Sequence, residues 1–254
     1  MTGRLKACSC VAGLLSAVWM IGAASAADLP VQMVTKAPPP PPPMFNWTGF
    51  YAGVNIGGSW GHQDVSLVTA GGTLTNGNNV NGVIGGAQIG YNWQGYGSPW
   101  VFGVEADIQG SGQRSTGSFF IPGGGVLLVI PPTTIAYEDK LDWFGTVRGR
   151  IGYAMGGGRF LPYITGGFAY GEGNLNGSGS AVGTPVAFNV SKTYTGWTLG
   201  AGAEWAFWDR WSAKAEYLYI DFGNGPTVAL TPAFTLTTGR LTDNIGRFGV
   251  NYRF

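Results

Sequence analysis

The stretch RLTDNIGRFGVNYRF, residues 240–254, carries the pattern that most clearly indicates the fold class. From Phe248 onward, large apolar side chains occupy every second position, namely Phe248, Val250, Tyr252 and Phe254. This period of two is typical of a β-strand with one apolar and one polar face. We therefore expect the chain to end in a strand. That strand either closes a barrel or lies at the edge of an ordinary sheet whose last residue happens to be Phe.

The composition indicates a membrane barrel rather than a soluble domain. The chain has 45 glycines, 10 Trp, 11 Tyr and 14 Phe, while only 11% of its residues are charged. Low charge with many aromatic residues is unusual for a soluble domain. It suits a wall with lipid outside, a crowded lumen inside and aromatic residues at both rims. Beyond the N-terminus no apolar stretch is long enough to span as a helix, so a membrane location would require a closed barrel.

Residues 1–26 are predicted to be a secretory signal peptide. A positively charged start precedes the apolar run 11–23, and an A-x-A site predicts cleavage at Ala24, Ala26 and Ala27. The alternative, an uncleaved anchor helix, would need a longer apolar run.

Cleavage would remove both cysteines, so we expect no disulfide and no thiol chemistry. Removing Arg4 and Lys6 leaves 12 basic and 13 acidic residues, a net charge of −1. Nothing in this balance favours nucleic-acid binding.

Residues 27–46 are predicted to form a proline-rich arm in the periplasm. The arm contains six consecutive prolines, 38–43, which favour an extended polyproline II spacer. The arm either contacts the cell wall or a partner, or acts as a simple spacer.

Residues 47–254 are predicted to form an all-β domain, a transmembrane eight-stranded antiparallel up-and-down β-barrel. Eight segments show the alternating pattern: 47–60, 80–93, 100–109, 140–154, 161–171, 193–207, 211–220 and the closing stretch at 240–254. Three short connections (94–99, 155–160, 208–210) alternate with four long ones (61–79, 110–139, 172–192, 221–238). This alternation is typical of outer-membrane barrels, with short turns in the periplasm and long loops outside. A soluble sandwich or a lipocalin has no reason to show it.

Aromatic residues are expected to form two girdles around this barrel. One set falls at the short-turn end: Trp47, Trp93, Trp100, Tyr153, Trp205, Trp211, Tyr252 and Phe254. The other falls nearer the long loops: Trp60, Trp143, Tyr170, Trp197 and Tyr219.

Charged residues of the strands are predicted to face the lumen. The polar faces carry four acids and four bases: Glu105, Asp107, Glu204, Glu216, Arg148, Arg150, Lys214 and Arg247. An eight-stranded barrel has an interior just wide enough for side chains to fill it. We therefore expect these charges to pair, with Gly53, Gly90 and Gly200 making room for the long Arg side chains. The alternative is that several lie near the rims and are solvated.

Several motifs resemble one protein family. They are NWTGFYAG at 46–53, GYNW at 90–93, VEAD at 104–107, DWFGTVRGR at 142–150 and NYRF at 251–254. Together they are similar to the small outer-membrane β-barrels of alphaproteobacteria, often called outer-membrane immunogenic or porin-family proteins. The resemblance implies an envelope protein related in architecture to the OmpA membrane domain. It also implies contact with outer-membrane lipid and lipopolysaccharide.

The closing strand resembles the C-terminal insertion signal of such barrels. The residues that would carry this signal are Phe248, Val250, Tyr252 and Phe254. The resemblance implies that the barrel-assembly machinery reads this strand during insertion.

Catalysis, metal binding and cofactor binding are not expected. His62 is the one histidine, and Ser59 and Asp64 lie nearby, but Ser59 is predicted to face the lumen, away from any common reaction centre. One histidine and no mature cysteine make a transition-metal site improbable. The glycine-rich stretches lack the Lys and Ser/Thr of a phosphate loop.

The connection between the third and fourth segments carries a candidate contact site. Two apolar runs around a glycine turn predict a hairpin, and its exposed candidates are Phe119, Phe120, Leu127 and Val129. This surface either binds a partner, a lipid or another copy, or packs on neighbouring loops around 186–188.

Three functions fit the sequence. We favour a structural and surface-interaction role, in which the barrel supports the envelope and displays its loops to an envelope or host partner. A narrow passive pore is the alternative, and a lipid A-modifying enzyme is the third.

Overall fold

The computed structural model describes residues 45–69, 71–121, 132–181, 184–231 and 234–254. The predicted signal peptide with Ala24, Ala26 and Ala27, nearly all of the proline-rich arm, and the contact candidates Leu127 and Val129 lie outside these ranges. Within the described ranges, no helix is long and apolar enough to cross a membrane.

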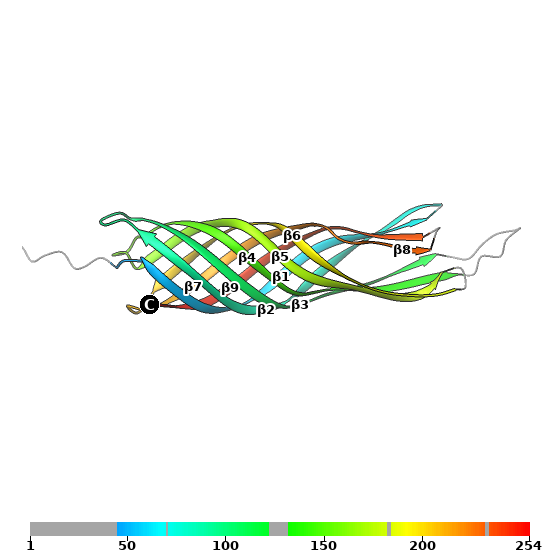
Figure 1. Cartoon of the computed structure of the whole chain (residues 1–254), viewed down its shortest axis with the longest axis horizontal. Coiled ribbons are helices and arrows are strands. Elements are labelled where there is room, and N and C mark those ends of the chain that lie inside the picture. The colour runs from blue at the N-terminus through cyan, green and yellow to red at the C-terminus, as the bar shows by residue number, and fades with distance from the viewer. Residues whose placement is uncertain (1–44, 70, 122–131, 182–183, 232–233) are drawn as a thin grey trace, which may run out of the picture. The chain divides into compact units, whose positions relative to one another are not determined.

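The domain is a closed antiparallel β-sheet (Figure 1). Its strands are β1 (Gly49–Thr69), β2 (Gly72–Gln94), β3 (Trp100–Ile121), β4 (Thr133–Tyr153), β5 (Phe160–Ala181), β6 (Thr184–Ala206), β7 (Trp211–Asn224), β8 (Thr227–Thr231) and β9 (Phe234–Arg253). Each strand from β1 to β7 pairs with the next, β7 pairs with β9, and β9 pairs with β1 to close the ring. We call the end with the short connections the turn end and the opposite end the hairpin end.

The sheet has nine strands in the described residues, not the expected eight. The extra strand, β8, follows β7 after a break at Gly225 and Pro226 and pairs with β9 alone. Gly223 adopts φ 70°, and Pro226 has no N–H to give to a ladder, so the chain leaves the sheet there and re-enters it. β8 thus continues the course of β7 along β9.

The prediction of four long loops is wrong. The strands run through most of those segments, so that β1 and β2 pair as far as Thr69 opposite Gly72. Every second residue still points inward, as Val65 and Leu67 show, with exposures of 1% and 0%. The outward residues there are mostly Thr, Asn, Ser and Gly, so the alternation is hard to recognise in the sequence.

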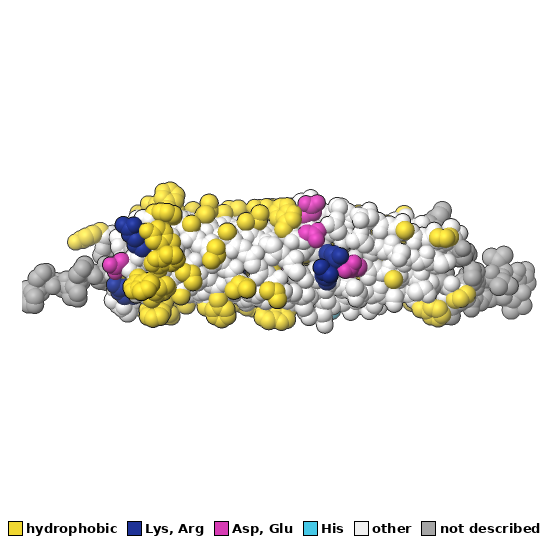
Figure 2. All heavy atoms as spheres, turned by 90° about the horizontal axis from the view of Figure 1, so that it is seen from below, with side chains coloured by type: hydrophobic (Ala, Val, Ile, Leu, Met, Phe, Trp, Pro, Cys, Tyr) yellow, Lys and Arg dark blue, Asp and Glu magenta, His cyan; other side chains and the backbone are white. Residues whose placement is uncertain are grey.

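The apolar face of each strand in the turn-end half points outward. In β1, Phe50, Val54 and Ile56 are 64–67% exposed, whereas Tyr51 and Asn55 are buried, which confirms the predicted alternation. Figure 2 shows hydrophobic side chains concentrated over the half of the domain toward the turn end, with a few charged residues beyond them. This apolar band is what a lipid-facing wall requires.

One strand changes face where the ladder is irregular. Trp143 was expected in the outer girdle, and strict alternation would place Leu141 on the same face, but Leu141 is buried in the lumen. A register irregularity between these two residues in the β4–β5 pair explains the change, because one extra residue moves the side chains that follow to the other face.

The ring divides into two four-stranded leaves toward the hairpin end. The β2–β3 ladder stops at Asn81 opposite Arg114, and the β6–β7 ladder stops at Trp197 opposite Asp221. One leaf contains the ends of β2, β1, β9 and β8, and the other contains those of β3, β4, β5 and β6 (Figure 1). We call this part the head. The two openings are the β2/β3 seam and the β6/β8 seam.

Candidate functional site

The lumen is the candidate site, and its centre is a cluster of eight charged side chains that we call the charge core. Its members are Glu105 and Asp107 on β3, Arg148 and Arg150 on β4, Glu204 on β6, Lys214 and Glu216 on β7, and Arg247 on β9. All eight are at most 5% exposed. The structure therefore brings together all eight charged residues that the alternation placed on the lumen face.

Two arginines connect the acids of the charge core. Arg148 donates to Glu105, to Asp107 at 3.0 Å and to Glu216 at 3.0 Å. Arg247 donates to Asp107 at 2.9 Å and lies 2.6 Å from Glu216. Each guanidinium presents several N–H donors in a fixed fork, so one side chain can serve several carboxylates at once.

The remaining bases complete the balance of charge. Lys214 donates to Glu105 at 2.9 Å, and Arg150 donates to Glu204 at 3.0 Å. With four acids and four bases, the charge core has no net charge in its ionised form. Pairing of this kind is required where charges are removed from water.

Neutral side chains supply further partners for the acids. The hydroxyl of Tyr51 donates to Glu105 at 2.6 Å, and that of Tyr163 donates to Glu216 at 3.0 Å. Glu204 accepts from Ser212 at 2.5 Å and from Asn251 at 2.8 Å. These polar partners were not predicted, although Tyr51 and Asn251 lie on lumen positions of the alternation.

The expected role of the glycines needs correction. Gly53, Gly90 and Gly200 make room for Asn251, Tyr51 and Leu218, respectively, and not for arginine side chains. The glycine beside Arg247 is Gly57, where an added Cβ would lie 2.7 Å from the arginine Cβ. Gly103 likewise lies beside Arg150, because a Cβ added at Gly103 would lie 3.1 Å from the Arg150 Cγ. Register decides which residue a lumen glycine faces, and the pattern of a single strand does not reveal it.

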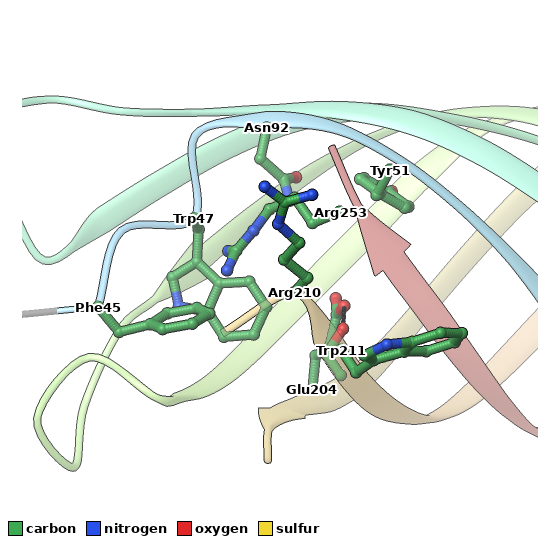
Figure 3. Close-up of a pocket in the computed structure, with 9 residues that line it drawn as sticks. Phe45, Trp47, Tyr51, Asn92, Glu204, Arg210, Trp211 and Arg253 are labelled. Carbon is green, nitrogen blue, oxygen red and sulfur yellow. Dashed lines mark hydrogen bonds between the residues drawn. The ribbon is translucent and has the colours of Figure 1, made fainter. Parts of the chain in front are cut away.

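The turn end of the lumen is filled by residues that precede β1 (Figure 3). Trp47 is 1% exposed, and its indole Nε1 donates to the carbonyl of Gly158 at 2.7 Å. Phe45 packs edge-on against Trp47, with ring centroids 5.0 Å apart, and the guanidinium of Arg253 lies 4.1 Å from the Phe45 ring. Trp47 was expected in the turn-end girdle, but it packs inside the barrel instead.

Little space remains between Trp47 and the charge core. The pocket there is lined by Tyr51, Asn92 and Glu204, among others, and its cavity volume is about 10 Å³ (Figure 3). A single water needs about 10–15 Å³ on this measure. The pocket can hold about one water.

Apolar side chains, together with the buried and hydrogen-bonded Ser59, Gln113 and Asp243, fill the lumen on the other side of the charge core. The upper cluster consists of Val80, Ile84, Leu141, Phe144, Ala169, Tyr194, Leu218, Ile220, Phe222, Leu241 and Ile245. The head cluster lies between the two leaves and consists of Val65, Leu67, Phe119, Ile135, Tyr137, Leu175 and Leu236. The strand β4 crosses all of these layers, since it carries Arg150 and Arg148, then Phe144 and Leu141, and then Tyr137 and Ile135.

The possible catalytic group does not assemble. His62 is exposed, lies 3.5 Å from Asp64 and hydrogen-bonds to Asn79 at 3.2 Å. Ser59 is buried in the lumen and donates to Asp243 at 2.6 Å. The possible nucleophile Ser59 and the possible base His62 therefore contact different residues and do not contact each other as a catalytic pair would. Among the described residues, no group of three or more His, Cys, Asp or Glu could hold a metal ion.

The remaining predicted residues, those of the insertion signal and the contact candidates, lie at opposite ends of the fold. Phe248 and Phe254 are 70% and 75% exposed on the outer face of β9, and the Phe254 amide donates to the Phe50 carbonyl at 3.0 Å. Of the contact candidates, Phe119 is buried in the head cluster and Phe120 is 63% exposed. Phe188 packs against the same cluster.

A closed antiparallel sheet with an apolar outer band and a filled, charged lumen defines the class of transmembrane β-barrels. The chain belongs to the outer membrane protein beta-barrel domain family, whose model matches residues 16–254. The family places the protein in the outer membrane.

Relatives in alphaproteobacteria are similar over most of the chain. The 31 kDa outer-membrane immunogenic protein of Brucella melitensis is 36% identical over 244 residues, which cover 91% of this chain and 93% of that protein. The 22 kDa outer membrane protein of Rhizobium leguminosarum is 32% identical, with 84% of each chain covered. The 25 kDa outer-membrane immunogenic protein of Brucella melitensis is 27% identical, with 91% of each covered.

Proposed function

We propose that this protein is a structural barrel of the outer membrane that does not conduct freely and that presents its head as a contact surface. The observation that carries the proposal is the filling of the lumen from end to end. Trp47, the charge core, the upper cluster and the head cluster follow one another along the barrel. A passive pore requires a continuous path of water, and each of these layers obstructs one.

The charge core supports rigidity as its role. Arg148 and Arg247 link acids that come from β3 and β7, strands on different sides of the ring. Ion pairs that cross a lumen fix the strands around them. Breaking a buried pair typically costs about 3–5 kcal/mol, because one charge is left without its partner.

A narrow pore remains the second candidate. Several buried polar atoms of the charge core have no hydrogen-bond partner among the described residues, for example Asp107 Oδ1, Arg150 Nη2 and Arg247 Nη1. Such atoms favour internal water. Water near the charge core would not by itself make a path, because the buried side chains of the upper cluster lie beyond it. An enzyme is the third candidate and has the least support, because Ser59 and His62 do not converge.

We infer the orientation from the two ends. Short turns face the periplasm in barrels of this class, so the turn end, the proline-rich arm and the C-terminus would lie there. The head would then lie outside the cell, available to an envelope or host partner. Lipid and lipopolysaccharide would surround the apolar band, and the barrel-assembly machinery would read the closing strand through Phe248, Val250, Tyr252 and Phe254.

Swelling of proteoliposomes in arabinose tests the proposal. Liposomes with the refolded protein are expected to swell no faster than empty ones, while a general porin in the same liposomes gives rapid swelling. Folding is checked by heat-modifiable mobility on gels. Rapid swelling with fully folded protein would reject the structural role and favour the pore.

A further inference from the structure

Within the part of the chain that the structure describes, the β2/β3 seam leaves two strand edges without a partner. Beyond Asn81 and Arg114, among the described strands, residues 72–80 of β2 pair only with β1, and residues 115–121 of β3 pair only with β4. Each edge therefore presents backbone N–H and C=O groups along one side. Free edges of this length are templates for pairing with another strand.

The seam does not close within one molecule because the head is a two-layer structure. Tyr137 of β4 crosses over Gly117 of β3, and its hydroxyl is hydrogen-bonded to Asn78 of β2. Phe119 stacks on the Tyr137 ring, with centroids 5.5 Å apart. Stacked sheets lie about 10 Å apart, whereas paired strands lie about 4.7–4.9 Å apart. The side chains between the leaves thus hold the two edges in different layers.

The β6/β8 seam is protected in ways that the β2/β3 seam is not. Its β6 edge contains Pro185, and the ammonium group of Lys192 donates to the carbonyl of Asn224 at 2.6 Å across the opening. Proline and lysine are the residues that commonly protect free edges. Residues 72–80 and 115–121 contain neither proline nor any charged side chain.

We propose that the β2/β3 seam pairs with the same seam of a second copy of this chain. Copies in one membrane share their orientation, so the two-fold axis between them runs parallel to the barrels. β3 of one copy then lies antiparallel to β2 of the other, and the reverse pair forms by symmetry. Each leaf continues into the opposite leaf of the partner, so all four free edges gain a ladder. The uncharged edges meet without repulsion.

Engineered cysteines test this pairing in intact outer membranes. If the register of Asn81 and Arg114 continues, Asn79 lies opposite Thr116, and both side chains are exposed. Copies with Asn79→Cys are co-expressed with copies carrying Thr116→Cys and then mildly oxidised. Ser191→Cys with Ala229→Cys, across the β6/β8 seam, is the matched control. We expect a disulfide-linked dimer from the first pair and none from the control.

The oligomeric mass gives a second readout that needs no cysteine. The wild-type protein in mild detergent is expected to sediment as a dimer. Ser118→Lys, which places a charge on the free β3 edge, should give a monomer, whereas Ser191→Lys should leave the dimer intact. A monomeric wild type without cross-linking at Asn79 and Thr116 would overturn the proposal. Equal cross-linking at both seams would also overturn it, because random collision would then explain the bond.

Discussion

Arg148 lies at the centre of the charge core and forms ion pairs with three of its acids. Changing Arg148→Ala leaves Glu105, Asp107 and Glu216 with one base fewer. We expect a loss of about 3–5 kcal/mol in the free energy of unfolding, as for other buried pairs broken on one side. The measurement is urea unfolding in detergent micelles.

Two further variants control this experiment. Adding Glu216→Gln to Arg148→Ala restores equal numbers of acids and bases, so part of the lost stability should return. Arg159→Ala removes an exposed ion pair with Asp209 and should change stability by at most about 1 kcal/mol. Equal losses for Arg148→Ala and Arg159→Ala would contradict a paired charge core.

Asp139 should make the stability of the head depend on pH. It lies four residues beyond Trp143 toward the hairpin end and is 6% exposed, and its Oδ2 has no hydrogen-bond partner in the described ranges. Burial raises the pKa of Asp139 to about 7. Because this folded-state pKa lies above the ordinary 3.8, the protonated form is favoured in the fold. The contribution of Asp139 to stability should therefore be most favourable below about pH 4 and should fall as the pH rises to about 7.

Asp139→Asn tests this dependence, because the amide cannot ionise. The difference between wild type and variant should grow between pH 4 and pH 7 by up to about 4 kcal/mol, at about 1.4 kcal/mol per pKa unit. Thermal unfolding across this range supplies the measurement. Parallel pH profiles for the two proteins would show that Asp139 does not titrate in the head.

Phe254, the residue that follows the closing strand β9, completes a set of aromatic contacts. Phe254 packs edge-on against Tyr252, with centroids 5.3 Å apart, and Tyr252 packs against Trp211 at 5.0 Å. Deleting Phe254 removes this contact and the last backbone bond to β1. We expect a lower yield of heat-modifiable protein in the membrane fraction. Phe120→Gln, at an exposed position of the head, should leave the yield unchanged, and a normal yield without Phe254 would argue against the insertion signal.

The strands of the head depend on the cluster between the leaves. Phe119 is buried there, whereas its neighbour Phe120 is exposed. Truncating a buried Phe typically costs about 3–5 kcal/mol, so Phe119→Ala should expose the head to protease while Phe120→Ala should not. The barrel should survive in both, as judged by heat-modifiable mobility. Equal protease resistance would show that the leaves hold together without this cluster.

Alternation along single strands predicted which residues face the lumen. It placed Glu105, Arg148 and Arg247 inside because each strand in lipid must present an apolar face outward. It could not predict the extended hairpins, since polar outward residues hide the alternation once the wall leaves the lipid. Trp47 was misplaced for a related reason: an aromatic residue before the first strand can serve a girdle or fill the lumen, and only tertiary contacts decide between them.

At the scale of the whole barrel, both the strand pairing and the lumen contacts join residues that lie far apart in the sequence. The two seams begin where the β2–β3 and β6–β7 ladders stop. Those positions depend on the packing between the leaves, so no local sequence pattern predicts them. For the same reason, the partners within the charge core could be predicted only as a balanced set. Register then decided that Arg148 meets Glu216 and that Arg150 meets Glu204.

Single-channel recording in planar bilayers tests most directly whether the lumen is filled and does not conduct freely. The refolded wild-type protein, with insertion verified by heat-modifiable mobility, should give no large and stable open state. Arg148→Ala, which loosens the charge core, should give at most brief leaks. Large, long-lived open-state currents from the wild-type protein would contradict a filled, non-conducting lumen and would establish a pore in place of a structural barrel.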